Sequence, residues 1–294
     1  MRAIIIGASG LIGTALYRVL RQNGVEVIGT RSSNAGAEEF LEFDLLKDEL
    51  PQKIGDIGET DTVYLLSAYS DPGWIFHHQP EAEALNYTRT RDLIDAIRPR
   101  RSRLIFMSSV EVFDGTKGAY AEDDATHPLN FYGRLKERIE RHLCDNCENF
   151  TIVRSGWNVG WDLASRCVVR LTYETLLRSG AKMAFDNEFS VVDVDDTAAC
   201  LARLMDKTGI PRIHACSDDK VNRAWLARRI MEKSVNRDLK GFREVPFDEI
   251  AYTERRGRLN DLVNGLSKSR LDMRYRGTRD IIDAKVALLD GGLK

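Results

Sequence analysis

The sequence predicts an α/β protein with a doubly wound parallel sheet and a smaller, interleaved C-terminal lobe. The first 155 residues alternate short runs of β-forming residues with longer segments of helical spacing, which is typical of βαβ units. A glycine-rich turn at residues 7–13 stands between the first of these strands and the first helix. After about residue 156 the alternation loosens, and this change favours a separate lobe.

Strands are expected where short apolar runs lie between turn signals. In chain order they are residues 4–6, 25–28, 40–43, 63–66, 104–107, 152–153 and 212–215. Helices are expected where apolar residues recur about every three to four positions. They are residues 11–22, 80–97, 131–143, 163–178, 195–206, 224–235 and 280–289. The arginine-rich stretch 236–279 is expected to be irregular.

Composition excludes several classes of protein. The chain has 294 residues, of which 43% are apolar and 30% charged, and its net charge of −2 offers no basic field for nucleic acid. No apolar run approaches the roughly 20 residues needed to span a bilayer, so no membrane partner is expected. Five scattered cysteines favour reduced thiols and a cytoplasmic location. Cys144 and Cys147 lack a second pair of ligands, so no metal site is expected.

The turn Gly-Ala-Ser-Gly-Leu-Ile-Gly at residues 7–13 predicts a dinucleotide site of the Rossmann kind. Its first glycine allows a sharp turn, its second lets backbone amides approach a pyrophosphate, and its third lets the helix pack close to the strand. The helix N-terminus adds free N–H groups and a partial positive charge. A glycine-rich turn without a ligand is the alternative. The expected cofactor contacts are Gly7, Ser9, Gly10, Leu11, Ile12 and Gly13.

The end of the second strand indicates which dinucleotide binds. Sites that prefer NAD place an acid there, about 20 residues after the glycines. Here the sequence is Thr30-Arg31-Ser32-Ser33. Arg31 can clamp a 2′-phosphate with the neighbouring hydroxyls as donors, so NADP(H) is expected rather than NAD(H). A solvated loop arginine is the alternative.

An acidic residue follows the third strand. Asp44, with Leu45 beside it, is placed to accept a hydrogen bond from the adenine amino group. Asp44 is equally suited to cap a helix N-terminus, and both interpretations stay open.

Tyr132 and Lys136 are four residues apart in an expected helix, so they share one face. A phenol has a pKa of about 10, and a nearby lysine cation lowers it. Tyr132 could then donate a proton to a ketone oxygen as hydride reaches the carbon. Ser108 and Ser109 follow a parallel strand at its carboxyl end, where ligands bind, and a serine there can polarise a carbonyl. By itself, the tyrosine–lysine pair is also compatible with a surface position.

Five segments together resemble the extended short-chain dehydrogenase/reductases, the NAD-dependent epimerase/dehydratase group. The segments are residues 7–13, 65–68, 108–115, 132–136 and 154–160. The resemblance covers about residues 1–215 and implies a Rossmann fold and an NAD(P)-dependent oxidoreductase. It implies that the catalytic residues are Ser109, Tyr132, Lys136 and, as a fourth member, Asn86. It also implies cofactor contacts from Ser67, Ala68 and Lys136.

Within this group, Val112-Phe113-Asp114-Gly115 is similar to the sugar-nucleotide 4-ketoreductases of the dTDP-4-dehydrorhamnose reductase type. This implies NADPH-dependent reduction of a keto-sugar nucleotide. Dehydratase members carry an Asp-Glu pair after the catalytic hydroxyl, and Val110-Glu111 here disfavours dehydration, although Glu111 could still deprotonate a carbon beside a ketone. Two other functions stay open: an NAD-dependent sugar-nucleotide 4-epimerase and a non-enzymatic NADP-binding regulatory protein. A reductase of a non-sugar carbonyl compound also stays possible.

The expected division follows from these motifs. Residues 1–155 form a dinucleotide-binding core, with 189–216 returning to its sheet, and residues 156–188 and 217–294 form a substrate-binding lobe. Some of the C-terminal arginines could converge on a nucleotide diphosphate, although a solvated surface suits most of them. They are Arg255, Arg256, Arg258, Arg270, Arg274, Arg276 and Arg279. The resemblance also implies that two copies can form a homodimer through the helix that carries Tyr132.

Overall fold

The computed structural model describes residues 2–32, 39–49, 53–163 and 165–292, so Ser33, an expected phosphate donor, lies outside the described residues. A seven-stranded parallel sheet has the order β10-β6-β5-β4-β1-β2-β3. Its strands are β1 (Arg2–Ile6), β2 (Glu26–Arg31), β3 (Leu41–Glu42), β4 (Thr62–Leu65), β5 (Arg103–Met107), β6 (Phe150–Ser155) and β10 (Arg212–Ala215). The predicted doubly wound Rossmann sheet is confirmed.

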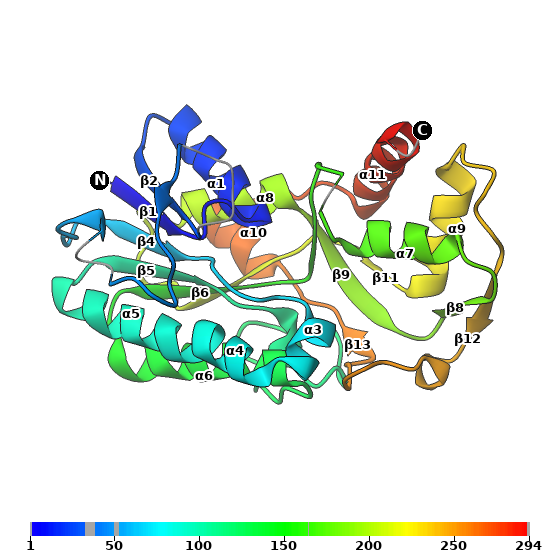
Figure 1. Cartoon of the computed structure of the whole chain (residues 1–294), viewed down its shortest axis with the longest axis horizontal. Coiled ribbons are helices and arrows are strands. Elements are labelled where there is room, and N and C mark those ends of the chain that lie inside the picture. Colours follow the sequence, from blue (N-terminus) through cyan, green and yellow to red (C-terminus); the bar gives the residue numbers. More distant parts are fainter. Residues whose placement is uncertain (1, 33–38, 50–52, 164, 293–294) are drawn as a thin grey trace.

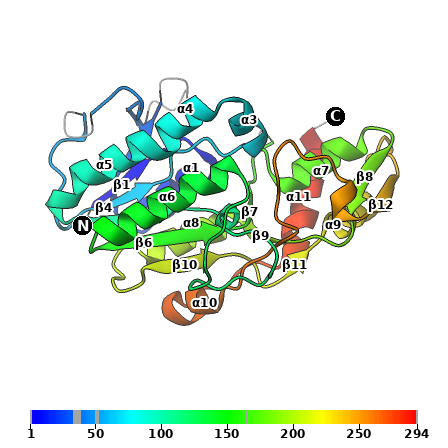
Figure 2. The same ribbon diagram turned by 90° about the horizontal axis from the view of Figure 1, so that it is seen from below.

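Helices cover both faces of this sheet (Figures 1 and 2). On one face lie α1 (Leu11–Gln22), α8 (Val194–Arg203) and α10 (Gly265–Leu271). On the other lie α4 (Gln79–Glu83), α5 (Thr90–Ile97) and α6 (Phe131–Asn146), with α3 (Pro72–His77) near the end of the sheet. Ile5 packs with the first group, whereas Ile4 and Ile6 pack with the second. A strand buried on both faces explains why its sequence is continuously apolar.

The helix expected over residues 80–97 contains a change of winding. A π-helical segment, η1 (Ala84–Arg89), connects α4 to α5 and carries Asn86. Single-turn π segments inside helices are frequent at functional sites. Short 3₁₀ segments occur at η2 (Arg98–Arg100), η3 (Val110–Val112) and η4 (Phe247–Glu249).

The second region of the molecule is built around β9 (Glu188–Asp193). In its sheet β9 pairs with β7 (Trp157–Val159), β11 (Lys220–Val221) and β13 (Leu259–Asn260). A two-stranded sheet joins β8 (Ala181–Ala184) to β12 (Phe242–Val245), and the helices are α7 (Val168–Leu176), α9 (Arg223–Lys233) and α11 (Thr278–Gly292). These helices share an apolar core that includes Tyr173, Leu226 and Ile282.

Two expectations about the later chain need correction. Of residues 189–216, β10 does join the main sheet, but β9 lies in the second sheet. The stretch 236–279 was expected to be irregular, yet it holds β12, β13 and α10. Strands of two to four residues are too short to leave a periodic pattern in the sequence.

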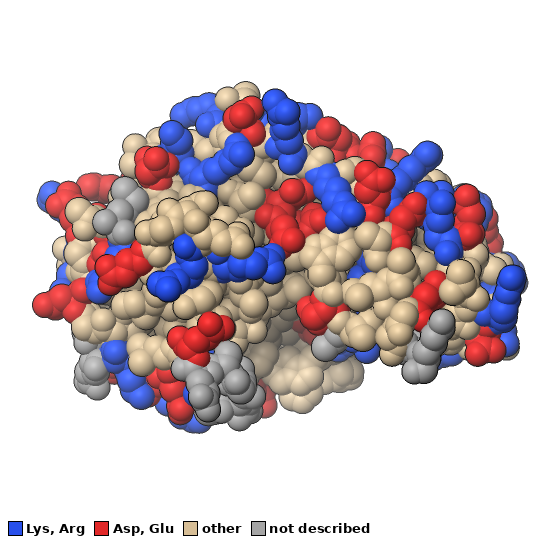
Figure 3. Space-filling view, turned by 90° about the horizontal axis from the view of Figure 1, so that it is seen from above, with Lys and Arg blue, Asp and Glu red and all other residues tan. Residues whose placement is uncertain are grey.

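Acidic and basic side chains interleave over the face shown in Figure 3. Among the described residues on this face, no broad patch of one sign is seen, in keeping with the small net charge. Among the described helices, none has the length and apolar character needed to cross a bilayer.

Candidate active site

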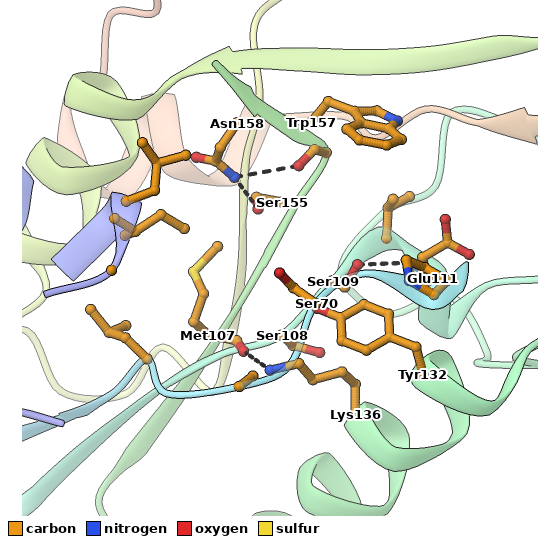
Figure 4. A pocket seen from close by; sticks show the side chains of 18 of the residues that line it. Ser70, Met107, Ser108, Ser109, Glu111, Tyr132, Lys136, Ser155, Trp157 and Asn158 are labelled. Carbon is orange, nitrogen blue, oxygen red and sulfur yellow. Dashed lines mark hydrogen bonds between the residues drawn. The ribbon is translucent and has the colours of Figure 1, made fainter. Parts of the chain in front are cut away.

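A cavity of about 320 Å³ opens at the carboxyl ends of β1, β4, β5 and β6. The main sheet region lines it with the glycine turn, the residues after β4 and β5, and the start of α6. The second region contributes Trp157, Arg166 and Arg256. Figure 4 shows that Ser109, Tyr132 and Lys136 come together in this cavity. Ligands of doubly wound sheets bind at this edge of the strands.

The glycine turn is shaped by close backbone approaches. Gly7 has a φ of 93°, and a Cβ there would stand 2.8 Å from the Ser67 amide nitrogen. A Cβ on Gly13 would stand 2.2 Å from the Gly7 carbonyl oxygen. Gly10, by contrast, is exposed at the N-cap of α1, and its side-chain position is open except for Gly7 at 3.4 Å. The turn therefore presents the N-terminus of α1 to the cavity, and the free N–H groups there suit an anionic group.

Thr30 supports this turn from inside. Its hydroxyl donates to the Ile5 carbonyl (3.2 Å) and accepts from the Gly7 N–H (3.1 Å), and its own carbonyl accepts from Ala8 (2.8 Å). The side chain is almost completely buried. Thr30 is thus placed to hold the turn in shape, which differs from the phosphate contact expected of it.

Arg31 and Ser32 lie at the end of β2. The Arg31 Nε is buried and lacks a hydrogen-bond partner within the described part of the chain, and its Nη2 is 3.9 Å from Glu42. Ser32 is exposed. A buried guanidinium N–H without a partner is costly, so the site fits a ligand with a phosphate at this position.

Asp44 and Leu45 begin a turn after β3. The Asp44 carboxylate accepts from the Leu46 N–H (3.0 Å) and pairs with Lys47 (2.9 Å), and the hydrogen bond with Lys47 lowers the pKa of Asp44. Leu45 is buried, and its carbonyl accepts from Arg89 (2.8 Å). Asp44 thus caps a turn rather than a helix, and its contact with adenine stays a prediction.

The segment after β4 joins the glycine turn to the cavity. Ser67 lies against Gly7, and Ala68 lines the cavity. Asn86 is not among the described residues that line it. The Asn86 side chain accepts from the Tyr69 N–H (2.9 Å) and donates to the Tyr69 carbonyl (2.8 Å). Asn86 is therefore placed to fix the position of this segment.

The helix α6 begins directly at the cavity. Asn130 caps it by accepting from the Gly133 N–H (2.8 Å). A Cβ on Gly133 would stand 2.0 Å from the Glu111 carbonyl oxygen, so this glycine lets α6 approach η3 closely. Ser109 precedes η3, where its hydroxyl accepts from the Glu111 N–H (3.2 Å). This close packing brings Tyr132 to Ser109.

Electrostatics differ between the two members of the tyrosine–lysine pair. Burial raises the pKa of the Tyr132 phenol far above its ordinary value, and the charge of Glu111 raises it further, whereas a hydrogen bond with Ser109 lowers it. Burial lowers the pKa of Lys136 to about 8, against the opposing charge of Glu140. We expected Lys136 to lower the pKa of Tyr132, but Lys136 is not among the groups that shift it, and burial raises the pKa instead. At neutral pH the phenol holds its proton and most of the lysine is charged.

The two adjacent serines have different surroundings. The Ser108 hydroxyl donates to the Glu140 carboxylate (2.5 Å). The Ser109 side chain is the one that forms a hydrogen bond with the Tyr132 phenol. Lys136 Nζ donates to the Met107 carbonyl (2.8 Å) and lies 5.7 Å from the centroid of the Tyr132 ring.

Sequence reasoning did not single out the charged residues of the second region that reach the cavity. Arg256 pairs with Glu111 (3.4 Å), which also accepts from Asn130 (2.5 Å). Arg166 pairs with Asp71 (2.7 Å) at the cavity mouth. Arginine enrichment near residue 256 was visible in the sequence, but no local pattern separates Arg256 from its neighbours.

Comparisons with known proteins agree with this geometry. The model of one family, described as the RmlD substrate binding domain, matches residues 1–282. Methionine adenosyltransferase 2 subunit beta of Xenopus laevis is 34% identical over 154 residues, which are 52% of this chain and 46% of that protein. The dTDP-4-dehydrorhamnose reductase of Aggregatibacter actinomycetemcomitans is 30% identical over 161 residues, 54% of this chain and 52% of that protein. The chain thus matches about half the length of these curated relatives.

A solved structure supports the fold over nearly the whole chain. The dTDP-4-dehydrorhamnose reductase of Bacillus anthracis, in complex with NADP, superposes with a TM-score of 0.78. It covers 96% of this chain and 97% of its own, at 17% sequence identity. At that identity the likeness establishes the fold alone.

Proposed function

Because the chain belongs to the family whose model is described as the RmlD substrate binding domain, we propose that it is an NADPH-dependent reductase of a keto-sugar nucleotide. It is an extended short-chain dehydrogenase/reductase, as its motifs indicated. The observation that carries the proposal is that Ser109, Tyr132 and Lys136 line the same cavity as the glycine turn.

The bound dinucleotide supplies the hydride. Tyr132 donates its proton to the carbonyl oxygen of the substrate, and its raised pKa supports this direction because the phenol is protonated at neutral pH. Ser109 orients the carbonyl by a hydrogen bond. The charge of Lys136 stabilises the phenolate that remains after proton transfer.

The cofactor assignment rests on the fit of two parts of the chain. The amides at the start of α1 hold the pyrophosphate, and Gly10 leaves them accessible. Arg31 and the exposed Ser32 hold a 2′-phosphate, which favours NADP(H) over NAD(H). Structural neighbours are described as complexes with NADP and with NAD, so the choice between the two cofactors rests on Arg31.

The second region supplies the substrate-binding lobe in this proposal. Arg256 and Trp157 reach the cavity from two separate segments of that region. A guanidinium suits a nucleotide diphosphate, and an indole can stack on a base or sugar. The division into a core of residues 1–155 and a lobe of residues 156–188 and 217–294 stays a prediction, as do the homodimer and the cytoplasmic location.

One observation favours a second candidate, a non-enzymatic NADP-binding regulatory protein. Several curated relatives carry the name methionine adenosyltransferase 2 subunit beta, at 28 to 34% identity. This name describes a subunit of an adenosyltransferase and not a reductase. The presence of both Tyr132 and Lys136 in the cavity supports the enzyme.

The purified chain should be tested with a panel of keto-sugar nucleotides. The reductase predicts that NADPH is consumed in proportion to the alcohol formed. Equilibrium dialysis with both cofactors is the companion measurement, because tightly retained NAD would indicate the 4-epimerase. Binding of NADPH without its consumption across the panel would favour the regulatory protein.

A further inference from the structure

Helix α6 carries a third ionisable side chain in line with the catalytic pair. Tyr132, Lys136 and Glu140 are spaced by four residues, so all three lie on the face of α6 that packs against the sheet. Glu140 is 3% exposed and lies one turn further from the cavity than Lys136. A buried carboxylate at this position is costly unless it has partners.

The partners of Glu140 come from two different strand ends. The Ser108 hydroxyl, just after β5, donates to one carboxylate oxygen (2.5 Å). Arg154 of β6 donates to both oxygens, from Nε (3.0 Å) and from Nη2 (2.6 Å), and is itself only 2% exposed. Glu140 thus ties α6 to the carboxyl ends of β5 and β6, next to the carbonyl of Met107 that holds Lys136.

We propose that Glu140, fixed by Arg154 and Ser108, is a positioning residue that keeps Lys136 charged and in place during reduction. The inference rests on the proposed function, since it concerns the same site. Glu140 does not line the cavity among the described residues, so it acts through Lys136 rather than on the substrate.

The groups that face Lys136 support this role. From β5 they are the Met107 carbonyl at 2.8 Å and the Phe106 ring, whose centroid lies 4.8 Å from Nζ. From α6 they are Tyr132, which is neutral at neutral pH, and Glu140.

Two charged residues lie further from Lys136. Arg154 of β6 stands behind Glu140, and Glu111 of η3 acts on Tyr132. Burial lowers the pKa of Lys136 to about 8, and Glu140 is the charge that opposes this lowering. If Glu140 were neutral, burial and the positive charge of Arg154 would both favour loss of the lysine proton.

The test is a direct titration of Lys136 in the Glu140→Gln variant. This change keeps the shape and one oxygen acceptor but removes the charge. Lysine side chains labelled with ¹³C are followed by NMR over pH, and the Lys136 signal is identified by its loss in Lys136→Arg. We expect a midpoint near 8 in the parent protein and a clearly lower midpoint in Glu140→Gln. An unchanged midpoint would overturn the inference.

Glu137→Gln is the matched control. Glu137 is a buried carboxylate on the same helix, 7% exposed, that accepts from Thr126 (2.5 Å) and pairs with Arg141 (2.9 Å). It is not among the groups that act on Lys136. Its variant should leave the Lys136 midpoint unchanged, and a shift as large as that of Glu140→Gln would contradict the specific role of Glu140.

A second readout separates this inference from the proposed function. As pH rises, the rate of NADPH oxidation falls once Lys136 loses its proton. This fall should begin at a lower pH in Glu140→Gln than in the parent or in Glu137→Gln. If the parent oxidises no NADPH but the NMR midpoint shifts, the proposed function fails and the effect of Glu140 on Lys136 holds.

If Glu140→Gln does not fold, the double variant Glu140→Leu with Arg154→Met removes both buried charges together, a change that is often tolerated. Its Lys136 midpoint should also lie below that of the parent, and an equal midpoint would count against the inference.

Discussion

The main sheet region and the second region bring their side chains to the cavity in different ways. Ser109 follows β5 closely, and Tyr132 lies at the start of α6. Both elements have strong local sequence patterns. Arg256 lies in a segment without regular structure, which is fixed by distant partners. Glu254 accepts from the Phe131 N–H (3.0 Å), and the Gly115 carbonyl accepts from Leu259 (2.8 Å). Under the proposed function, the residues for the chemistry therefore lie in the regular part of the chain, whereas those for substrate recognition are held by contacts far apart in the sequence.

The replacement Tyr132→Phe tests the chemical side of this comparison most severely. It removes the proton donor and keeps the packing, so we expect kcat to fall by about 10²–10⁴-fold, since this is the usual contribution of general acid catalysis. NADPH affinity, measured by fluorescence titration, should stay the same. A fall in kcat of less than about tenfold would place the proton donor elsewhere.

Arg256→Gln tests the recognition side. Loss of one charge-assisted contact to an anionic substrate should raise KM for the sugar nucleotide by about 10–100-fold, with a smaller change in kcat. The control is Arg258→Gln, in the same segment, because Arg258 is 53% exposed and pairs with Asp186. If both variants behave alike, Arg256 has no special place in recognition.

The same difference explains what the sequence could predict. Helix α1 and strand β10 have the bounds expected from their apolar spacing, and the cavity contains Tyr132, Lys136 and Ser109 together. Asn86 was correctly placed in a helical segment and Thr30 near the end of the second strand, but their hydrogen bonds run to backbone groups elsewhere. A side chain's partner depends on tertiary packing, which local periodicity does not encode.

Arg31→Gln tests whether the end of β2 selects the phosphate of the cofactor. We expect NADPH affinity to fall by roughly tenfold while NADH affinity changes little, because one charge-assisted phosphate contact is lost. Arg21→Gln, at the exposed end of α1, is the control and should leave both affinities unchanged. Equal losses for both cofactors would indicate that Arg31 does not meet the 2′-phosphate.

The pH dependence of the reaction is expected to be the smallest effect. Reduction needs Lys136 charged, and its pKa lies at about 8, so the rate should decline as pH rises through that value. Between about pH 7 and about pH 8.5 the decline should be about fourfold, in proportion to the charged fraction. Tyr132 keeps its proton throughout because its pKa is raised. Initial rates at saturating substrate measure this, and a flat profile across the range would contradict the role given to Lys136.

The central claim is that hydride reaches a carbonyl carbon in the cavity where the two regions meet. Deuterium transfer tests it most directly, with NADPH labelled at the transferable position and a panel of keto-sugar nucleotides as acceptors. The account predicts one deuterium in the product, bound to the former carbonyl carbon, and almost none with Tyr132→Phe. Bound NADPH that passes no deuterium to any acceptor would contradict the account.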